Sequence, residues 1–415
     1  MTPPVTDLVA LQRRTVRVLS TAQVLGGIGV GSAISVGGLI AEDVSGSTAL
    51  SGLSQTSSVL GAAVLALPMA RLMSVRGRRP GLAGGYLVAL TGSALVVLGA
   101  VLGRFSLVLV GAALMGAGTA TNLQSRYAAA DLAEPAHRAR ALATVVWATT
   151  LGVVLGPNLT GPGATVAGWF GVPVLTGPVL FSVAAFVAAA AVVHTGLRPD
   201  PLLTARAAGE EEHLPAVPLR ESLRSVAASR PALLAIAAVA TAHTVMVAVM
   251  VMTPVHMRHH DASLEVVGLV ISLHVAGMYA FSPLVGWLTD RLGRVPVLVT
   301  GQLVLVVAVA VSGSVTSSGA LGAGLLLLGL GWSCALIAGS TLLSESVAAA
   351  VRPGVQGASD FVMGVCGAAG GALAGLVVGL AGYGTLNALA GLLVVPVLVL
   401  AGLRRSRRTP VPAAS

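Results

Sequence analysis

Sulfur and imidazole side chains recur at helical spacing in two neighbouring apolar segments of the chain. Met246 and Met250 are four residues apart in one segment, and His274 and Met278 are four residues apart in the next. Residues at i and i+4 share a helix face, so each pair projects in one direction. Thioether and imidazole groups suit Cu(I), whereas Mg²⁺, Ca²⁺ and Mn²⁺ prefer oxygen ligands. The spacing therefore indicates a soft-metal site between two helices.

The two pairs are expected at similar depths. Counting inward from segment ends near residues 257 and 264 at about 1.5 Å a residue places Met246 about 16 Å and His274 about 15 Å from the surface. Core packing is the competing interpretation, because methionine commonly fills gaps in apolar cores. A further pair at the same spacing, Met69 and Met73, lies in an earlier segment. On spacing alone, both interpretations stay open.

Three other side chains are candidates for the same site. His243 shares the helix face of Met246 and Met250, so it is a further candidate ligand or proton-transfer group. Met363 and Cys366 are three residues apart in a later apolar segment. A histidine bonded to a backbone carbonyl and an inert buried cysteine are the alternatives for these positions.

The composition indicates that these helices lie in a membrane. The 415 residues are 55% hydrophobic and only 9% charged, with a mean hydropathy of +0.91, whereas soluble domains carry about 25% charged residues. An all-α membrane protein with many spanning helices follows. The chain has no lysine and no Walker-type phosphate loop, which argues against an ATP-driven pump. We expect a protein that is no enzyme, needs no cofactor and binds no nucleic acid.

Twelve apolar segments are each long enough to cross a membrane. They cover about 17–41, 49–72, 80–103, 105–131, 139–163, 172–196, 230–257, 264–289, 294–313, 319–345, 355–380 and 382–403. The one long polar stretch divides them into an N-terminal six-helix bundle (1–196), a cytoplasmic linker (197–229) and a C-terminal six-helix bundle (230–415).

The arginines predict the orientation of these segments. Placing both termini in the cytoplasm puts 22 of the 24 arginines on the cytoplasmic side and leaves only Arg104 and Arg258 outside. Positive side chains concentrate in cytoplasmic loops. We therefore expect a multi-pass protein of the bacterial cytoplasmic (inner) membrane, surrounded by lipid, with both termini inside.

The two halves are related by an internal repeat. The stretch Arg-Gly-Arg-Arg-Pro at 76–80 and the stretch Leu-Gly-Arg-Val-Pro at 292–296 coincide under a shift of 216 residues. The same shift places Met246, Met250, His274 and Met278 opposite Val30, Ile34, Ser58 and Ala62. The soft ligands therefore occur in one half only, so the repeated fold itself does not require them.

The loop between the eighth and ninth segments resembles the signature of the major facilitator superfamily. It reads Gly286-Trp287-Leu288-Thr289-Asp290-Arg291-Leu292-Gly293-Arg294. The resemblance implies a transporter whose two bundles rock about a central site. It also makes Gly286, Asp290, Arg291, Gly293 and Arg294 a conformational latch at helix ends. The first half departs from the pattern, because Ser74 stands where the acid would be.

The Met-x3-Met and His-x3-Met pairs together resemble the CcoA-like copper importers of this superfamily. That branch supplies copper for haem-copper oxidase assembly, so the resemblance makes Met246, Met250, His274 and Met278 copper ligands and a cytoplasmic copper-receiving protein or the oxidase assembly machinery a partner. The branch is similar to bacterial riboflavin transporters that lack these motifs. Transport of a small organic molecule, by riboflavin uptake or drug efflux, is the alternative, although aromatic residues make up only 3% of the chain.

No carboxylate is expected in the middle of a segment. Asp360 and Glu345 lie near the predicted cytoplasmic ends, where a latch or surface role is expected. Any proton coupling would then depend on His243 or His274.

Overall fold

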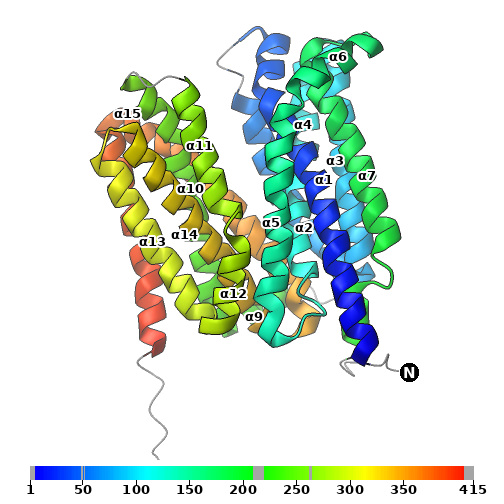
Figure 1. The fold of residues 1–415 in the computed structure, drawn as a ribbon, viewed down its shortest axis with the longest axis vertical. Helices are drawn as coiled ribbons and strands as arrows, with labels where there is room; N and C mark the ends of the chain where they lie inside the picture. Colours follow the sequence, from blue (N-terminus) through cyan, green and yellow to red (C-terminus); the bar gives the residue numbers. More distant parts are fainter. Residues whose placement is uncertain (1–4, 48–49, 51, 209–218, 261–263, 406–415) are drawn as a thin grey trace, which may run out of the picture.

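The computed structural model describes residues 5–47, 50, 52–208, 219–260 and 264–405. These residues form α-helices and short 3₁₀ helices, and no strand occurs among them. The helices are α1 (Val5–Ser45), α2 (Gly52–Arg76), α3 (Arg78–Val101), α4 (Phe105–Ala128), α5 (Arg138–Asn158), α6 (Thr160–Phe170), α7 (Gly177–Gly196), α8 (Pro201–Ala208), α9 (Leu219–Ala228), α10 (Arg230–His259), α11 (Leu264–Tyr279), α12 (Ser282–Leu292), α13 (Arg294–Ser314), α14 (Ser318–Glu345) and α15 (Arg352–Arg405) (Figure 1).

Eleven helical stretches within the described residues are long and apolar enough to cross a membrane. The last of them belongs to α15, which is 54 residues long and contains a non-helical residue, Gly382, with φ 84° and ψ 168°. Two helices join at this glycine, so the predicted segments 355–380 and 382–403 lie on either side of it. Helices dominate because a hydrocarbon solvent offers no partner to a backbone N–H or C=O group.

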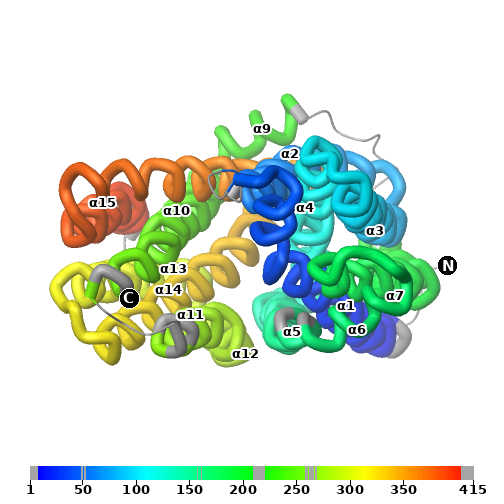
Figure 2. Tube along the Cα trace, turned by 90° about the horizontal axis from the view of Figure 1, so that it is seen from above, coloured from blue at the N-terminus to red at the C-terminus, as the bar shows by residue number. Residues whose placement is uncertain are grey.

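The helices form two groups that lie side by side when the molecule is seen from above (Figure 2). In the first half, α1 packs against α5 and α7, and α3 packs against α4. In the second half, α10 packs against α15, and α14 packs against both α11 and α13. The halves meet where α2 contacts α15 and α5 contacts α12. The linker residues Glu210, Glu211 and Glu212 lie outside the described residues.

Each half has its own buried apolar cluster, and a third cluster joins the halves. Leu82 and Phe186 belong to the first, and Met246 and Trp332 belong to the second. The third includes Ala143 of α5 together with residues of α12, α13 and α14. It lies at the end of the molecule that carries the loop 286–294, which we call the signature end.

The repeat is visible in the backbone. Gly77 and Gly293, which are 216 residues apart, have φ angles of 92° and 98° and immediately precede α3 and α13. After these helices the shift falls to 213, because α4 begins at Phe105 and α14 at Ser318.

One glycine in each half packs closely against a neighbouring helix at equivalent positions. A Cβ atom added to Gly116 of α4 would meet the backbone of Ser58 and Ala62. A Cβ atom added to Gly329 of α14 would meet the backbone of His274 and Met278. The positions paired by the 216-residue shift therefore make equivalent helix contacts in the two halves.

Gly293 is the position at which we test the backbone of the repeat. A Gly293→Ala substitution forces a Cβ into the left-handed region, which costs about 1–2 kcal/mol. We expect a lower melting temperature for the purified protein in detergent. Gly319→Ala is the control, because Gly319 lies in α14 with open space around it. Equal melting temperatures for the two variants would contradict the expectation.

Candidate functional site

Asp290 of the signature loop caps a helix of the other half. Its Oδ1 accepts a hydrogen bond from the backbone N–H of Ala139 at 3.1 Å, and its Oδ2 accepts one from that of Arg140 at 2.9 Å. Both donors lie in the first turn of α5, whose N–H groups have no intrahelical partner and which carries the positive end of the helix dipole. The carboxylate therefore joins α12 to α5 by charge-assisted bonds.

Arg294 adds a second connection at the same end. Its guanidinium forms a bidentate ion pair with Glu345 of α14, at 3.0 Å from Nε and 2.8 Å from the terminal nitrogen. The same terminal nitrogen donates to the carbonyl oxygen of Pro135 in the first half. Glu345, predicted to have a latch or surface role, also lies 3.8 Å from Arg138 of the first half.

Two other residues of the signature, Arg291 and Gly286, have different contacts. Arg291 stacks over the ring of Trp287 at 5.1 Å, whereas the polar contacts to the first half come from Asp290 and Arg294. Gly286 lies where α12 crosses α5, and a Cβ added to it would come within 2.5 Å of Ala143 Cβ. This glycine permits the close approach that brings Asp290 to the end of α5.

The first half makes an equivalent contact with different residues. Arg78, which corresponds to Arg294, pairs with Asp131 at 2.8 Å and donates to Gln356 Oε1 of the second half at 2.8 Å. Ser74, which replaces the acid, bonds to the carbonyl of Arg71 in its own helix. Asp200 instead accepts the backbone N–H of Arg79 at 2.7 Å. The arginine is retained across the repeat, and the acid is not.

A buried ion pair between Arg126 and Asp360 joins the halves further inside. Asp360 of α15 pairs with Arg126 of α4 at 2.6 Å, and the two side chains are 2% and 1% exposed. Gln124 donates to the second carboxylate oxygen at 2.8 Å, and Ser340 accepts from Arg126 Nε at 3.1 Å. Asp360 lies eight residues into α15, about 12 Å along the helix. Asp360 therefore lies near the start of this long helix, as expected, and it is buried between the halves rather than exposed at the surface.

The predicted methionine ligands lie in the apolar cluster of the second half. Met246 and Met278 are buried, Met363 is buried in the same cluster, and Met250 packs against it while partly exposed. Cys366 is half-buried and forms no disulfide. No three His, Cys, Asp or Glu side chains converge among the residues that the structure describes. Thioethers would therefore have to contribute to any metal site built around His274.

His274 is completely buried and held in one tautomer. Its Nδ1 lies 2.9 Å from the carbonyl oxygen of Leu325 on α14. A carbonyl only accepts, so Nδ1 carries the proton and the lone pair of the neutral ring is at Nε2. Nε2 has no hydrogen-bond partner among the described residues. Metal-binding histidines show this arrangement, in which one ring nitrogen donates to a carbonyl and the other binds the metal.

His243 is held in the opposite tautomer. The indole N–H of Trp332 donates to His243 Nδ1 at 3.1 Å. Since indole only donates, Nδ1 uses its lone pair here and the neutral ring carries its proton at Nε2. Nε2 lies close to Gly367 of α15, where an added Cβ would come within 2.8 Å. In this arrangement neither ring nitrogen of His243 offers a lone pair to a metal.

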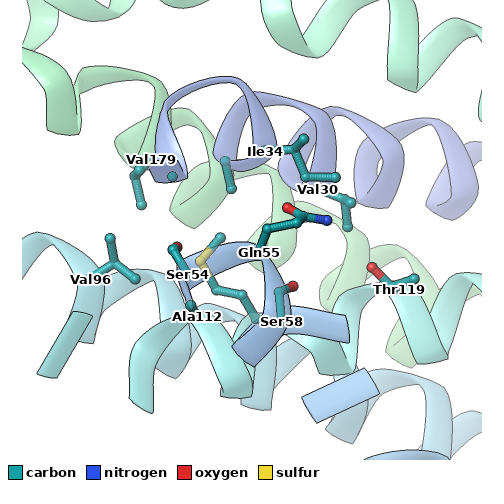
Figure 3. Close-up of a pocket in the computed structure, with 12 residues that line it drawn as sticks. Val30, Ile34, Ser54, Gln55, Ser58, Val96, Ala112, Thr119 and Val179 are labelled. Atoms are coloured by element: carbon teal, nitrogen blue, oxygen red, sulfur yellow. The ribbon is translucent and has the colours of Figure 1, made fainter. Parts of the chain in front are cut away.

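A small cavity of about 30 Å³ occupies the corresponding region of the first half (Figure 3). It is lined by Val30, Ile34 and Ser58, which the repeat places opposite Met246, Met250 and His274, together with the side chains of Gln55 and Thr119. These positions come from α1, α2 and α4, so residues of three helices share one space. Volume of this size holds a water molecule rather than an organic substrate.

The family model described as Major Facilitator Superfamily matches residues 19–263 and 240–415. The chain belongs to the major facilitator superfamily. It is therefore a multi-pass, secondary-active membrane transporter, and the members of this superfamily are transporters rather than enzymes.

Relatives in the superfamily cover almost the whole chain. The chain is 39% identical to the uncharacterized MFS-type transporter YddS of Bacillus subtilis (strain 168), over 94% of this chain and 91% of that one. It is 29% identical to the riboflavin transporter RfnT of Brucella anthropi, over 93% and 94%.

Solved structures share the fold at low sequence identity. The human organic anion transporter MFSD10 superposes with a TM-score of 0.73 at 19% identity, covering 94% of this chain and 99% of that one. A bacterial homologue of the iron transporter ferroportin, in an outward-facing state, gives 0.72 at 13% identity, covering 95% and 99%.

Replacing Asp290 by Asn tests the contact of this transporter's signature loop with α5. Asn keeps one acceptor but loses the charge, and hydrogen bonds to charged groups are worth about 1.5–3 kcal/mol. We expect the equilibrium between conformations of the transporter to shift about tenfold away from the state in which Asp290 caps α5.

Spin labels measure this shift. They are placed at Glu134→Cys and Leu292→Cys, two exposed positions at the signature end, in a background that lacks Cys334 and Cys366. Longer distances in the Asp290→Asn protein are expected. An unchanged distance distribution would show that Asp290 does not hold the halves together.

The Arg126 and Asp360 pair gives a second prediction. Asp360→Asn leaves a buried guanidinium without its counter-ion, and breaking a buried pair in this way costs about 3–5 kcal/mol. We expect a clear fall in melting temperature for Asp360→Asn and for Arg126→Gln. The fall for the double variant should be smaller than the sum of these two falls. The exposed Arg104→Gln is the control. Additive effects of the two single substitutions would refute the coupling.

Proposed function

We propose that this superfamily member imports copper by alternating access through Met246, Met250, His274 and Met278. The observation that carries the proposal is the buried His274, whose Nδ1 is bonded to Leu325 and whose Nε2 has no hydrogen-bond partner in the part of the chain that the structure describes. Met278 lies one turn further along the same helix, and Met246 is buried in the same cluster as Met278. Thioether and imidazole together suit Cu(I).

The repeat supports the convergence of these side chains. Val30, Ile34 and Ser58 line one cavity in the first half. Their counterparts Met246 and Met250 lie on α10, and His274 lies on α11. Because the two halves are built on the same plan, side chains at these positions would face a common space in the second half as well. There the imidazole of His274 would fill part of the volume that is a cavity in the first.

Full coordination is required for an ion to cross at this depth. A bare cation in hydrocarbon has a prohibitive solvation cost, so the ligands must replace its water. Two to four soft ligands from facing helices can do so. His243, Met363 and Cys366 lie on α10 and α15, and of these Met363 belongs to the same buried cluster. Met363 is therefore the favoured additional ligand, whereas His243 is engaged by Trp332.

The proposed topology has twelve spans in two six-helix bundles, 1–196 and 230–415, joined by a cytoplasmic linker. Both termini lie in the cytoplasm of a bacterial cell, and the signature end faces the cytoplasm. The arginine distribution and the break of α15 at Gly382 support this topology. Copper would leave at the signature end to a copper-receiving protein or to the machinery that assembles haem-copper oxidases.

A small organic molecule is the second candidate substrate. The few aromatic side chains of the chain include Trp332, which lies 5.8 Å from Tyr279 in an edge-to-face arrangement and 6.2 Å from His243. Aromatic side chains of this kind can stack on a planar ring system. The similarity to a riboflavin transporter favours the same candidate.

One uptake experiment separates the two substrates. Cells that express the protein receive radioactive copper or labelled riboflavin, and membrane levels are measured in parallel. We expect the wild type to accumulate copper and Met246→Leu/Met278→Leu and His274→Gln to accumulate little. Met-to-Leu swaps usually cost less than about 1.5 kcal/mol of stability, so these variants should remain folded.

The matched control is Met69→Leu/Met73→Leu, a buried i, i+4 pair in α2. It should retain copper uptake. Copper uptake at the wild-type level in Met246→Leu/Met278→Leu would refute the ligand assignment. Uptake of riboflavin without copper in the wild type would establish the second candidate instead.

A further inference from the structure

Two histidines lie four residues apart where α10 ends, opposite the signature end: His256 is in the last turn of the helix, and His260 directly follows it. The ring centroids of His256 and His260 are 4.4 Å apart, and the ring planes are inclined by 52°. Residues four apart share a helix face. Two histidines with this spacing on one helix are the arrangement through which helical zinc sites supply two of their ligands.

The ring of His256 rests on a fixed surface. It stacks on Tyr383 of α15 with a centroid distance of 4.3 Å and an interplanar angle of 14°. Tyr383 is only 5% exposed. Thr253 donates its own hydroxyl hydrogen to Val249, so the Tyr383 hydroxyl donates to Thr253 Oγ1 at 2.8 Å. The imidazole of His256 is therefore ordered before any ligand arrives, which lowers the entropic cost of binding.

The exposed ring of His260 is held in one tautomer. Its Nδ1 lies 2.9 Å from the carbonyl oxygen of His256, and a carbonyl only accepts, so Nδ1 carries the proton. The lone pair of the neutral ring is then at Nε2. A backbone carbonyl that fixes the second nitrogen in this way is the usual support of a metal-bound imidazole.

We infer that His256 and His260 bind one divalent transition-metal ion, with water completing the coordination. Two imidazoles on adjacent positions of a metal, with bonds of about 2.0–2.1 Å, hold their ring centres about 4.5–5 Å apart. The observed separation of the ring centroids, 4.4 Å, is close to this range. Imidazole ligands favour Cu²⁺ over Ni²⁺ and Zn²⁺, and they do not retain Mg²⁺ or Ca²⁺.

This site is separate from the proposed transport site. His256 is six residues beyond Met250 on α10, about 9 Å along the helix. The inference therefore holds whether the transported substrate is copper or an organic molecule.

Metal binding to the purified full-length protein tests the inference. The protein carries a purification tag without histidine, and equilibrium dialysis against Ni²⁺ is followed by elemental analysis. We expect one Ni²⁺ per chain in the wild type and at least about tenfold weaker binding in His260→Ala and in His256→Gln. The electron paramagnetic resonance spectrum of bound Cu²⁺ should show coupling to two imidazole rings, and one ring in either variant.

Three controls keep the assignment specific. His137→Ala removes an exposed histidine elsewhere, His259→Ala removes the neighbouring residue, and His274→Gln removes the proposed transport ligand. All three should retain the Ni²⁺ affinity. Binding that persists in His260→Ala, or that is lost in His259→Ala or His274→Gln, would overturn the inference. Loss of copper uptake in His274→Gln with intact Ni²⁺ binding separates this site from the proposed function.

Discussion

The buried ion pair between Arg126 and Asp360 is the interaction on which the arrangement of the two halves depends. Two ions in a medium of low dielectric constant are tolerable only while they remain paired, and these two belong to α4 and α15, on opposite sides of the interface. With the pair formed, α2 lies against α15 and α5 lies against α12. Any state in which the halves separate at this end must bring both charges to water or give Asp360 another partner. The energetic demand of alternating access is thus concentrated at one position.

The contacts around this pair show how a duplicated fold can diverge. Arg78 and Arg294 each follow a glycine with positive φ, each pairs with an acid of the same half, and each donates to the opposite half. The acid that caps α5, Asp290, has only Ser74 as its counterpart, and α3 is instead capped by Asp200 of the linker. The signature end is therefore asymmetric: α12 is tied to α5 by a carboxylate, whereas α2 meets α15 through close packing, as where Gly357 faces Ala66 and Ala70.

Hydropathy located the spans well because hydrocarbon leaves the backbone few alternatives to a helix. The motif around Asp290 was also found in advance, since its residues are contiguous and the contacts it makes belong to helix ends. The pairing of Arg126 with Asp360 could not be predicted, because 234 residues separate them in the sequence. The sequence also could not show that Arg294 rather than Arg291 contacts the first half, because the direction of each side chain depends on how α12 and α13 meet.

His243, bonded to Trp332, and His274, bonded to Leu325, illustrate what a residue type alone leaves open. The spacing to Met278 made His274 a main candidate ligand, and His243 was an additional candidate. Their hydrogen-bond partners assign opposite tautomers to them: indole fixes the lone pair of His243 in a bond, whereas a carbonyl leaves that of His274 at Nε2. A buried acceptor without a partner costs about 1–3 kcal/mol, and a bound cation would recover that free energy. The first half has a serine at the equivalent position beside a small cavity. The halves thus differ in the chemistry of the region where the proposed substrate binds, whereas Arg78 and Arg294 make equivalent contacts in both.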